Sequence, residues 1–66
     1  MTFREFLQFK KDDDTPEGDF ANDFIRDSNA PVFLSIKPFI GYLHYKGACD
    51  EAISVGKKLF KKWERS

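Results

Sequence analysis

His44, Cys49 and Asp50 lie within seven residues, and they are the side chains that come nearest to a catalytic set in this chain. A cysteine at a helix N-terminus carries more thiolate, which is the nucleophilic form. The 66 residues contain one histidine and one cysteine, without a glycine-rich phosphate loop or a nucleophile elbow. We therefore predict that the protein is not an enzyme and that Cys49 is a small, half-buried residue at a helix start.

Metal-binding patterns are incomplete as well. Zinc requires about four ligands, and one histidine with one cysteine cannot supply them. The acidic run Asp12–Asp14 suggests a calcium loop, but Phe24 stands where such a loop requires a bidentate Glu. We predict no metal, no cofactor and no small-molecule substrate, and we read the acidic run as solvated side chains near a helix N-terminus. The alternative is a loose divalent-cation site among these three aspartates.

The charges are distributed unevenly although the chain is neutral overall. Residues 1–30 hold eight acids and four bases, a net charge of −4, whereas residues 31–66 hold three acids and seven bases, a net charge of +4. The basic candidates for a binding surface are Lys57, Lys58, Lys61, Lys62 and Arg65. The acidic candidates are Asp13, Asp14, Asp19 and Asp23.

These charges predict a non-catalytic module that binds another protein through charged surfaces. Opposite charges on the two halves favour head-to-tail self-association, which salt would weaken. The alternative function is binding of DNA, with the basic residues contacting phosphates. The simplest interpretation is that the lysines only keep the domain in solution. Lys37, His44 and Lys46 extend the basic surface if the fold brings them close.

The first two predicted helices have clear start signals. Thr2 and Glu5 have the spacing of a capping box, so the first helix begins at about Phe3. Phe3, Phe6, Leu7 and Lys10 share one face at helical spacing, whereas Phe9 falls outside this stripe and is either a second contact or exposed. Thr15-Pro16 predicts a second helix that extends to about Arg26, with Asn29-Ala30-Pro31 as the stop signal. The second helix buries Phe20, Ala21, Phe24 and Ile25.

Residues 32–36, VFLSI, have the composition of a strand, but no second strand-like run exists to pair with them. We predict an irregular apolar connector in the core, with strand pairing across a dimer as the alternative. The third helix begins between Ser35 and Pro38 and ends at Gly47, which favours a left-handed cap. Gly41 in its middle is typical of close approach by a neighbouring element.

The fourth predicted helix runs from Asp50 to about Glu64, with acids at its start and bases toward its end. Its predicted buried stripe is Ala52, Val55, Gly56, Leu59, Phe60 and Trp63. The eleven aromatic residues (eight Phe, two Tyr, one Trp) are needed for the core of so short a chain. We therefore predict an all-α, single-domain bundle of four to five short helices over residues 1–66.

A resemblance agrees with this outline. It is carried by Phe3, Phe6 and Leu7, by Pro16-x-Gly18-Asp19-x-Ala21-x-Asp23, by Asp27 and Pro31, and later by Tyr42-Leu43, Gly47–Ala52 and Trp63. The chain resembles the YozE-type family of small bacterial proteins with a sterile-alpha-motif-like (SAM-like) helical fold. That resemblance implies a role in protein–protein contacts or, less often, in nucleic-acid binding.

The composition also bears on location. Charged residues interrupt every apolar stretch near the N-terminus, so we expect no signal peptide. Nothing approaches the roughly 18 apolar residues that span a bilayer, and a single cysteine forms no intrachain disulfide. We therefore expect a cytoplasmic protein that does not bind membranes.

Overall fold

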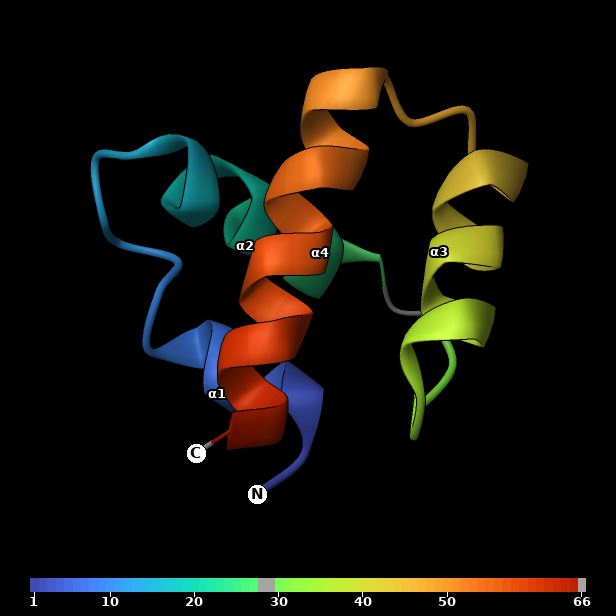
Figure 1. Ribbon diagram of the computed structural model, residues 1–66. Helices are drawn as coiled ribbons and strands as arrows, with labels where there is room; N and C mark the ends of the chain where they lie inside the picture. The colour runs from blue at the N-terminus through green and yellow to red at the C-terminus, as the bar shows by residue number, and fades with distance from the viewer. Residues whose placement is uncertain (28–29, 66) are drawn as a thin grey trace. The chain divides into compact units, whose positions relative to one another are not determined.

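The computed structural model describes residues 1–27 and 30–65, which form four α-helices (Figure 1). They are α1 (Phe3–Gln8), α2 (Pro16–Arg26), α3 (Ile36–Tyr45) and α4 (Asp50–Arg65). The described residues contain no strand, which confirms the predicted all-α class. The chain divides into two compact units, residues 1–32 with α1 and α2 and residues 33–66 with α3 and α4. The single domain over 1–66 stays a prediction.

The capping box at the start of α1 forms as predicted. The Glu5 backbone N–H donates to Thr2 Oγ1 at 3.1 Å, and the Thr2 backbone N–H donates to Glu5 Oε1 at 2.8 Å. These two hydrogen bonds satisfy backbone donors that a helix start would otherwise leave without partners. The helix ends at Gln8 and is therefore only six residues long.

The start and end of α2 also confirm the sequence signals. Thr15 Oγ1 accepts from the Gly18 N–H at 3.1 Å, and Pro16 occupies the first helical position. The helix ends at Arg26, and Asp27 follows in an extended conformation with φ −80° and ψ 90°. Asn29, part of the predicted stop signal, lies outside the described residues.

The core of the first unit joins α1 to α2 through aromatic rings. Phe3 and Phe24 meet edge to face with ring centroids 5.9 Å apart, and both side chains are buried. Leu7 and Ala21 are buried as well, whereas Phe20 and Ile25 are only half-buried. This partly confirms the predicted stripe of α2. In the first helix, Phe9 lies outside the predicted stripe and is 73% exposed.

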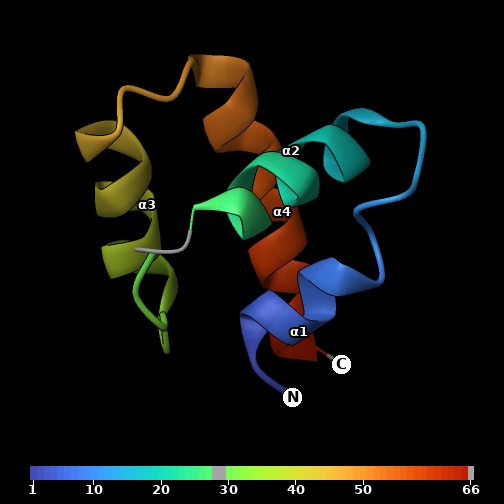
Figure 2. The same cartoon turned by 180° about the vertical axis from the view of Figure 1, so that it is seen from behind.

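Gly18 allows the loop between α1 and α2 to fold back on the first turn of α2 (Figure 2). A Cβ atom at this position would collide with the carbonyl oxygen of Asp13 and would lie 3.0 Å from that of Lys10. The loop is held by the Asp13 N–H, which donates to the Lys10 carbonyl at 3.0 Å. The side chain of residue 18 must therefore be absent for the loop to close.

α3 ends at Tyr45, and Gly47, just after its C-cap Lys46, adopts the left-handed conformation that the sequence predicts, with φ 75°. The Ala48 N–H donates to the Leu43 carbonyl and the Gly47 N–H to the His44 carbonyl, both at 3.0 Å. This is the Schellman pattern of hydrogen bonds. Within the second unit no neighbouring element approaches Gly41, because no atom outside the backbone of its own helix lies within 4 Å of the place where its Cβ would stand.

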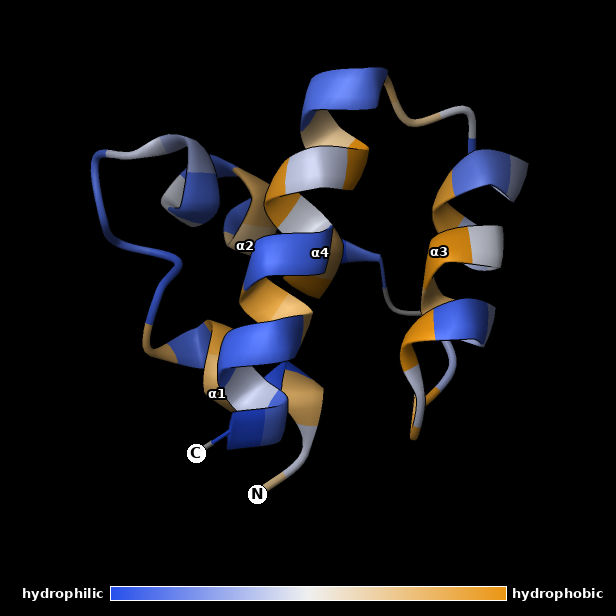
Figure 3. Cartoon of the chain, viewed as in Figure 1, coloured by the Kyte–Doolittle hydropathy of each residue, from blue (hydrophilic) through white to orange (hydrophobic). Residues whose placement is uncertain are grey.

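The second unit is built around Phe60. Its ring stacks on that of Phe39, with the ring centroids 5.0 Å apart. It meets the Trp63 ring edge to face, with a centroid distance of 5.2 Å. Phe39, Leu43 and Leu59 are buried beside it, so α3 and α4 share one aromatic core. The alternating apolar and polar bands of α4 follow this arrangement (Figure 3). The predicted stripe missed Ile53, which is buried, and overstated Ala52 and Trp63, which are half-buried.

The predicted connector at residues 32–36 is correct in its backbone and wrong in its burial. Residues 32–35 form neither helix nor strand. Phe33 is buried. Its ring centroid lies 5.5 Å from that of Phe39 and 5.3 Å from that of Tyr42. Val32 and Leu34, however, are 74% and 85% exposed. Of these three residues, only Phe33 turns inward.

Candidate functional site

The basic residues of α4 lie together on one side of the helix. A rotation of about 100° per residue places all five within an arc of about 140°. All five are exposed. We call this surface the cationic face; it consists of Lys57, Lys58, Lys61, Lys62 and Arg65.

The opposite side of α4 is buried, so the cationic face is held in a fixed orientation. Ile53, Val55, Gly56, Leu59 and Phe60 are its buried residues, and they occupy the remaining arc. From Lys57 onward the cationic face contains no carboxylate, because Glu64 projects just beyond its edge. The other acids of α4, Asp50 and Glu51, belong to its first turn.

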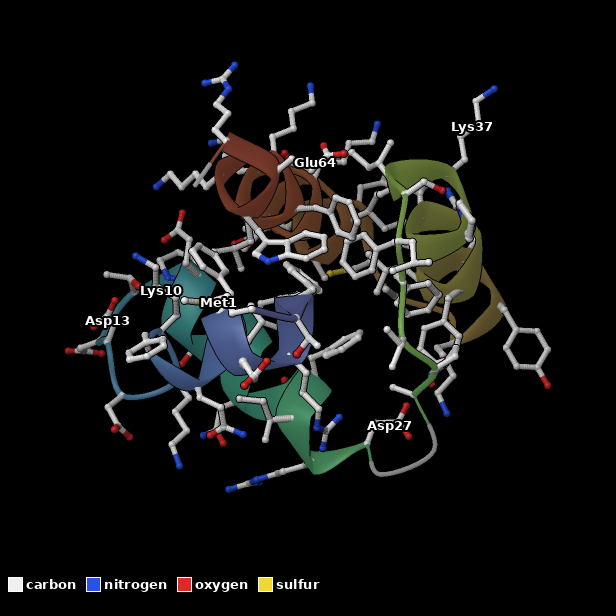
Figure 4. The ribbon with its side chains drawn as sticks, turned by 90° about the horizontal axis from the view of Figure 1, so that it is seen from below. Met1, Lys10, Asp13, Asp27, Lys37 and Glu64 are labelled. Carbon is white, nitrogen blue, oxygen red and sulfur yellow. The ribbon has the colours of Figure 1, made fainter. Side chains whose placement is uncertain are left out.

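The three residues that were expected to extend this surface behave differently from one another. Lys46 Nζ lies 5.9 Å from the centroid of the Tyr42 ring, so this ammonium interacts with an aromatic face. Lys37 reaches outward from α3 (Figure 4). His44 is exposed in the last turn of α3. They belong to α3 or its C-cap, whereas the cationic face belongs to α4.

The predicted acidic residues are all exposed. Asp19 and Asp23 lie one turn apart on the exposed side of α2, together with Arg26. Asp13 and Asp14 lie in the loop before α2, and the Asp13 side chain reaches outward (Figure 4). We call these four residues the acidic set. They belong to residues 1–32, whereas the cationic face belongs to residues 33–66.

The residues with catalytic or metal-binding types do not assemble into a site. Cys49 is exposed, which corrects the prediction of a half-buried thiol. The Cys49 backbone carbonyl accepts a hydrogen bond from the Ile53 N–H at 3.0 Å, so Cys49 directly precedes the first residue of α4. Among residues 1–27 and 30–65, no group of three or more His, Cys, Asp and Glu could hold a metal ion. No helix in the described part of the chain is long and apolar enough to cross a membrane.

Arg4 is a structural residue that the sequence analysis missed. Its guanidinium donates to the carbonyl oxygen of Ile25 and, at 3.4 Å, to that of Asp27. These carbonyls lie at the C-terminus of α2, where cations are favoured by the helix dipole. Local sequence patterns do not predict this contact, because Ile25 and Asp27 are 21 and 23 residues from Arg4 in the chain.

Comparison of the chain with models of protein families, with curated proteins and with solved structures finds no match. The resemblance to the YozE-type family and to the SAM-like fold therefore stays a prediction.

Proposed function

We propose that this protein is a non-catalytic binding module that recognises an acidic protein surface with the cationic face. The observation that carries the proposal is the segregation of α4 into five exposed cations on one side and a buried apolar stripe on the other. Because the buried stripe fixes the rotation of the helix, a partner meets the cations as an ordered array. The YozE-type resemblance, which implies protein–protein contacts, supports the same role.

The strength of such a contact follows from the exposure of its charges. An ion pair between exposed side chains contributes roughly 0.2–1 kcal/mol. Five such pairs give about 1–5 kcal/mol together, which corresponds to weak and transient binding. Salt should weaken it further, since exposed charges are screened within about 8 Å at physiological ionic strength.

Poly-L-glutamate is a suitable probe for this proposal. In an NMR titration at low salt, we expect the amide signals of α4 between Lys57 and Arg65 to shift, and the shifts to vanish in the Lys57→Glu/Lys61→Glu variant. Lys11→Glu/Arg26→Glu is the matched control, because it reverses two exposed positive charges in a different unit. Equal effects of the two variants, or no shifts in α4, would contradict a specific cationic face.

The acidic set makes a second copy of the chain one candidate partner. Asp19 and Asp23 share the four-residue spacing of Lys57 and Lys61, so complementary rows can meet head to tail. Light scattering at low ionic strength should detect oligomers. Asp19→Lys/Asp23→Lys and Lys57→Glu/Lys61→Glu should each abolish them, and mixing the two variants should restore them. If only monomer is found, the acidic partner is a foreign protein.

Binding of DNA is the second candidate, and the absence of carboxylates from the cationic face beyond Lys57 favours it. With about four phosphate contacts, a salt slope near −0.9 per contact predicts a roughly hundredfold loss of affinity between 50 and 200 mM salt. A gel-shift titration with a short duplex at both salt concentrations tests this function. No binding at the lower concentration with micromolar protein would remove it.

A further inference from the structure

The outer side of α3 presents three residues at intervals of four, Lys37, Gly41 and Tyr45, which we call the α3 row. Residues four apart lie on the same face of a helix, one turn above another. All three are exposed, and the Tyr45 side chain is 84% exposed. The buried residues of α3, Phe39 and Leu43, lie on the other side of the helix. The α3 row is therefore an outward-facing surface of the second unit.

Gly41, at the centre of the α3 row, packs against no other element among the described residues of the second unit. No atom lies within 4 Å of the position that its Cβ would occupy. A glycine in the middle of a helix lowers its stability, so alanine would serve α3 better on its own. What glycine provides here is bare backbone, which another helix can approach closely.

We propose that the α3 row is the contact through which two copies of this chain form a symmetric dimer, with the two α3 helices crossing at Gly41. Lys37 and Tyr45 each stand about 6 Å along the helix from Gly41, on opposite sides of it. When the two helices run antiparallel about a two-fold axis at Gly41, the Lys37 ammonium of each copy lies against the Tyr45 ring of the other. The rows of two helices align in this way at a crossing angle of about −50°, the commonest packing class.

The chemistry of the α3 row fits a second copy better than an unrelated partner. A lysine ammonium is attracted to the face of a tyrosine ring, and the same pairing already occurs between Lys46 and Tyr42 in this unit. Equal spacing of cation and ring about a bare centre makes the surface complementary to itself, which a two-fold interface requires. An acidic partner would engage Lys37 but would leave Gly41 and Tyr45 without a role.

The electrostatics distinguish this contact from the one proposed for the cationic face. Residues 33–66 hold seven bases and three acids, a net charge of +4, and the dimer brings two such units together. Their repulsion is screened by salt, so the dimer should become stronger as salt rises. Binding of an acidic partner to the cationic face should become weaker. The α3 helix has ten residues, so the interface is small and the dimer forms only at high protein concentration.

Sedimentation equilibrium of the full chain, at up to about 1 mM protein and at both about 20 and 300 mM salt, tests the dimer. Gly41→Ala adds one methyl group at the crossing point. We expect it to raise the dissociation constant about tenfold without lowering the melting temperature. Tyr45→Lys should abolish the dimer, and mixing it with Lys37→Tyr should restore a heterodimer with both cation–ring pairs. Lys37→Gln should weaken the dimer, whereas Lys57→Gln, which removes the same charge from α4, should not.

Three results would overturn the proposal. The first is a monomer at both salt concentrations, and the second is a dimer that Gly41→Ala and Tyr45→Lys leave unchanged. The third is a dimer that weakens with salt and disappears in the Lys57→Glu/Lys61→Glu variant. That last result would place the contact on the cationic face, supporting the proposed function while refuting the α3 dimer.

Discussion

The guanidinium of Arg4 donates a hydrogen bond to the carbonyl oxygen of Ile25 and so ties the first turn of α1 to the last turn of α2. The same guanidinium donates a second hydrogen bond, to the Asp27 carbonyl at 3.4 Å. One half-buried cation thus caps the negative end of a helix that is not its own. The contact complements the ring pair of Phe3 and Phe24, which joins the same two helices.

Replacing Arg4 should destabilise the first unit. Arg4→Ala leaves two carbonyls without their charged donor, so we expect the free energy of unfolding to fall by about 1–2 kcal/mol in urea denaturation. The free energy of unfolding of Arg4→Lys should lie between those of the unmutated protein and Arg4→Ala, because an ammonium lacks the planar, forked donors of a guanidinium. Arg26→Ala, an exposed arginine at the same helix end, is the control and should cost about 0.5 kcal/mol or less. Equal losses for both alanine variants would refute the capping role of Arg4.

The two glycines at helical positions should respond in opposite ways to alanine. Gly18→Ala forces a methyl group into the backbone of the loop at Asp13, and we expect a loss of about 2–3 kcal/mol despite the better helix propensity. Gly41→Ala meets no atom and should gain about 0.5–1 kcal/mol. Thermal unfolding of both variants checks this pair. A stabilised Gly18→Ala protein would show that the loop does not close on α2.

The capping box should make the start of α1 sensitive to acid. Hydrogen bonds from the Thr2 backbone and side chain hold the pKa of the Glu5 carboxyl below its ordinary value. A pKa that is lower in the folded state means stabilisation that is full above the unfolded pKa and is lost as pH falls through the folded one. In Thr2→Ala, the pKa of Glu5 should rise toward its ordinary value in a carboxyl NMR titration. Thr15→Ala, which removes the cap of α2 instead, should leave it unchanged.

Phe60 should be the most sensitive position of the second unit. Its ring is fully buried between Phe39 and Trp63, so Phe60→Ala should cost about 3–5 kcal/mol and Phe60→Leu about 1–1.5 kcal/mol. Trp63 is the only tryptophan, so its fluorescence reports the loss directly. Phe9→Ala is the matched control, since that ring is 73% exposed and should contribute little. Comparable losses for the two alanine variants would contradict the aromatic core.

Local signals account for what the sequence predicted well. Thr2 with Glu5, Thr15 with Pro16, and Gly47 each act within a few residues, so spacing alone located the helix ends. The periodicity of α4 likewise placed its cations opposite its apolar stripe.

The features that the sequence did not predict depend on which segments fold back against other parts of the chain. Gly18 is needed because the loop at Asp13 folds back, and Arg4 caps α2 because α1 packs beside it. The exposure of Val32 and Leu34 follows from the inward turn of Phe33, which composition does not reveal. The residues of the cationic face and of the acidic set are exposed, as predicted, but exposure is common to binding surfaces and to solvated ones.

The open position of Cys49 has a practical consequence for every measurement of self-association proposed above. An unshielded thiol on each copy allows air oxidation to join two chains into a covalent dimer at the start of α4. Such a species would survive both high salt and dilution and would imitate a tight complex. A reducing agent, or a Cys49→Ser background, keeps the weak equilibria of α3 and α4 visible.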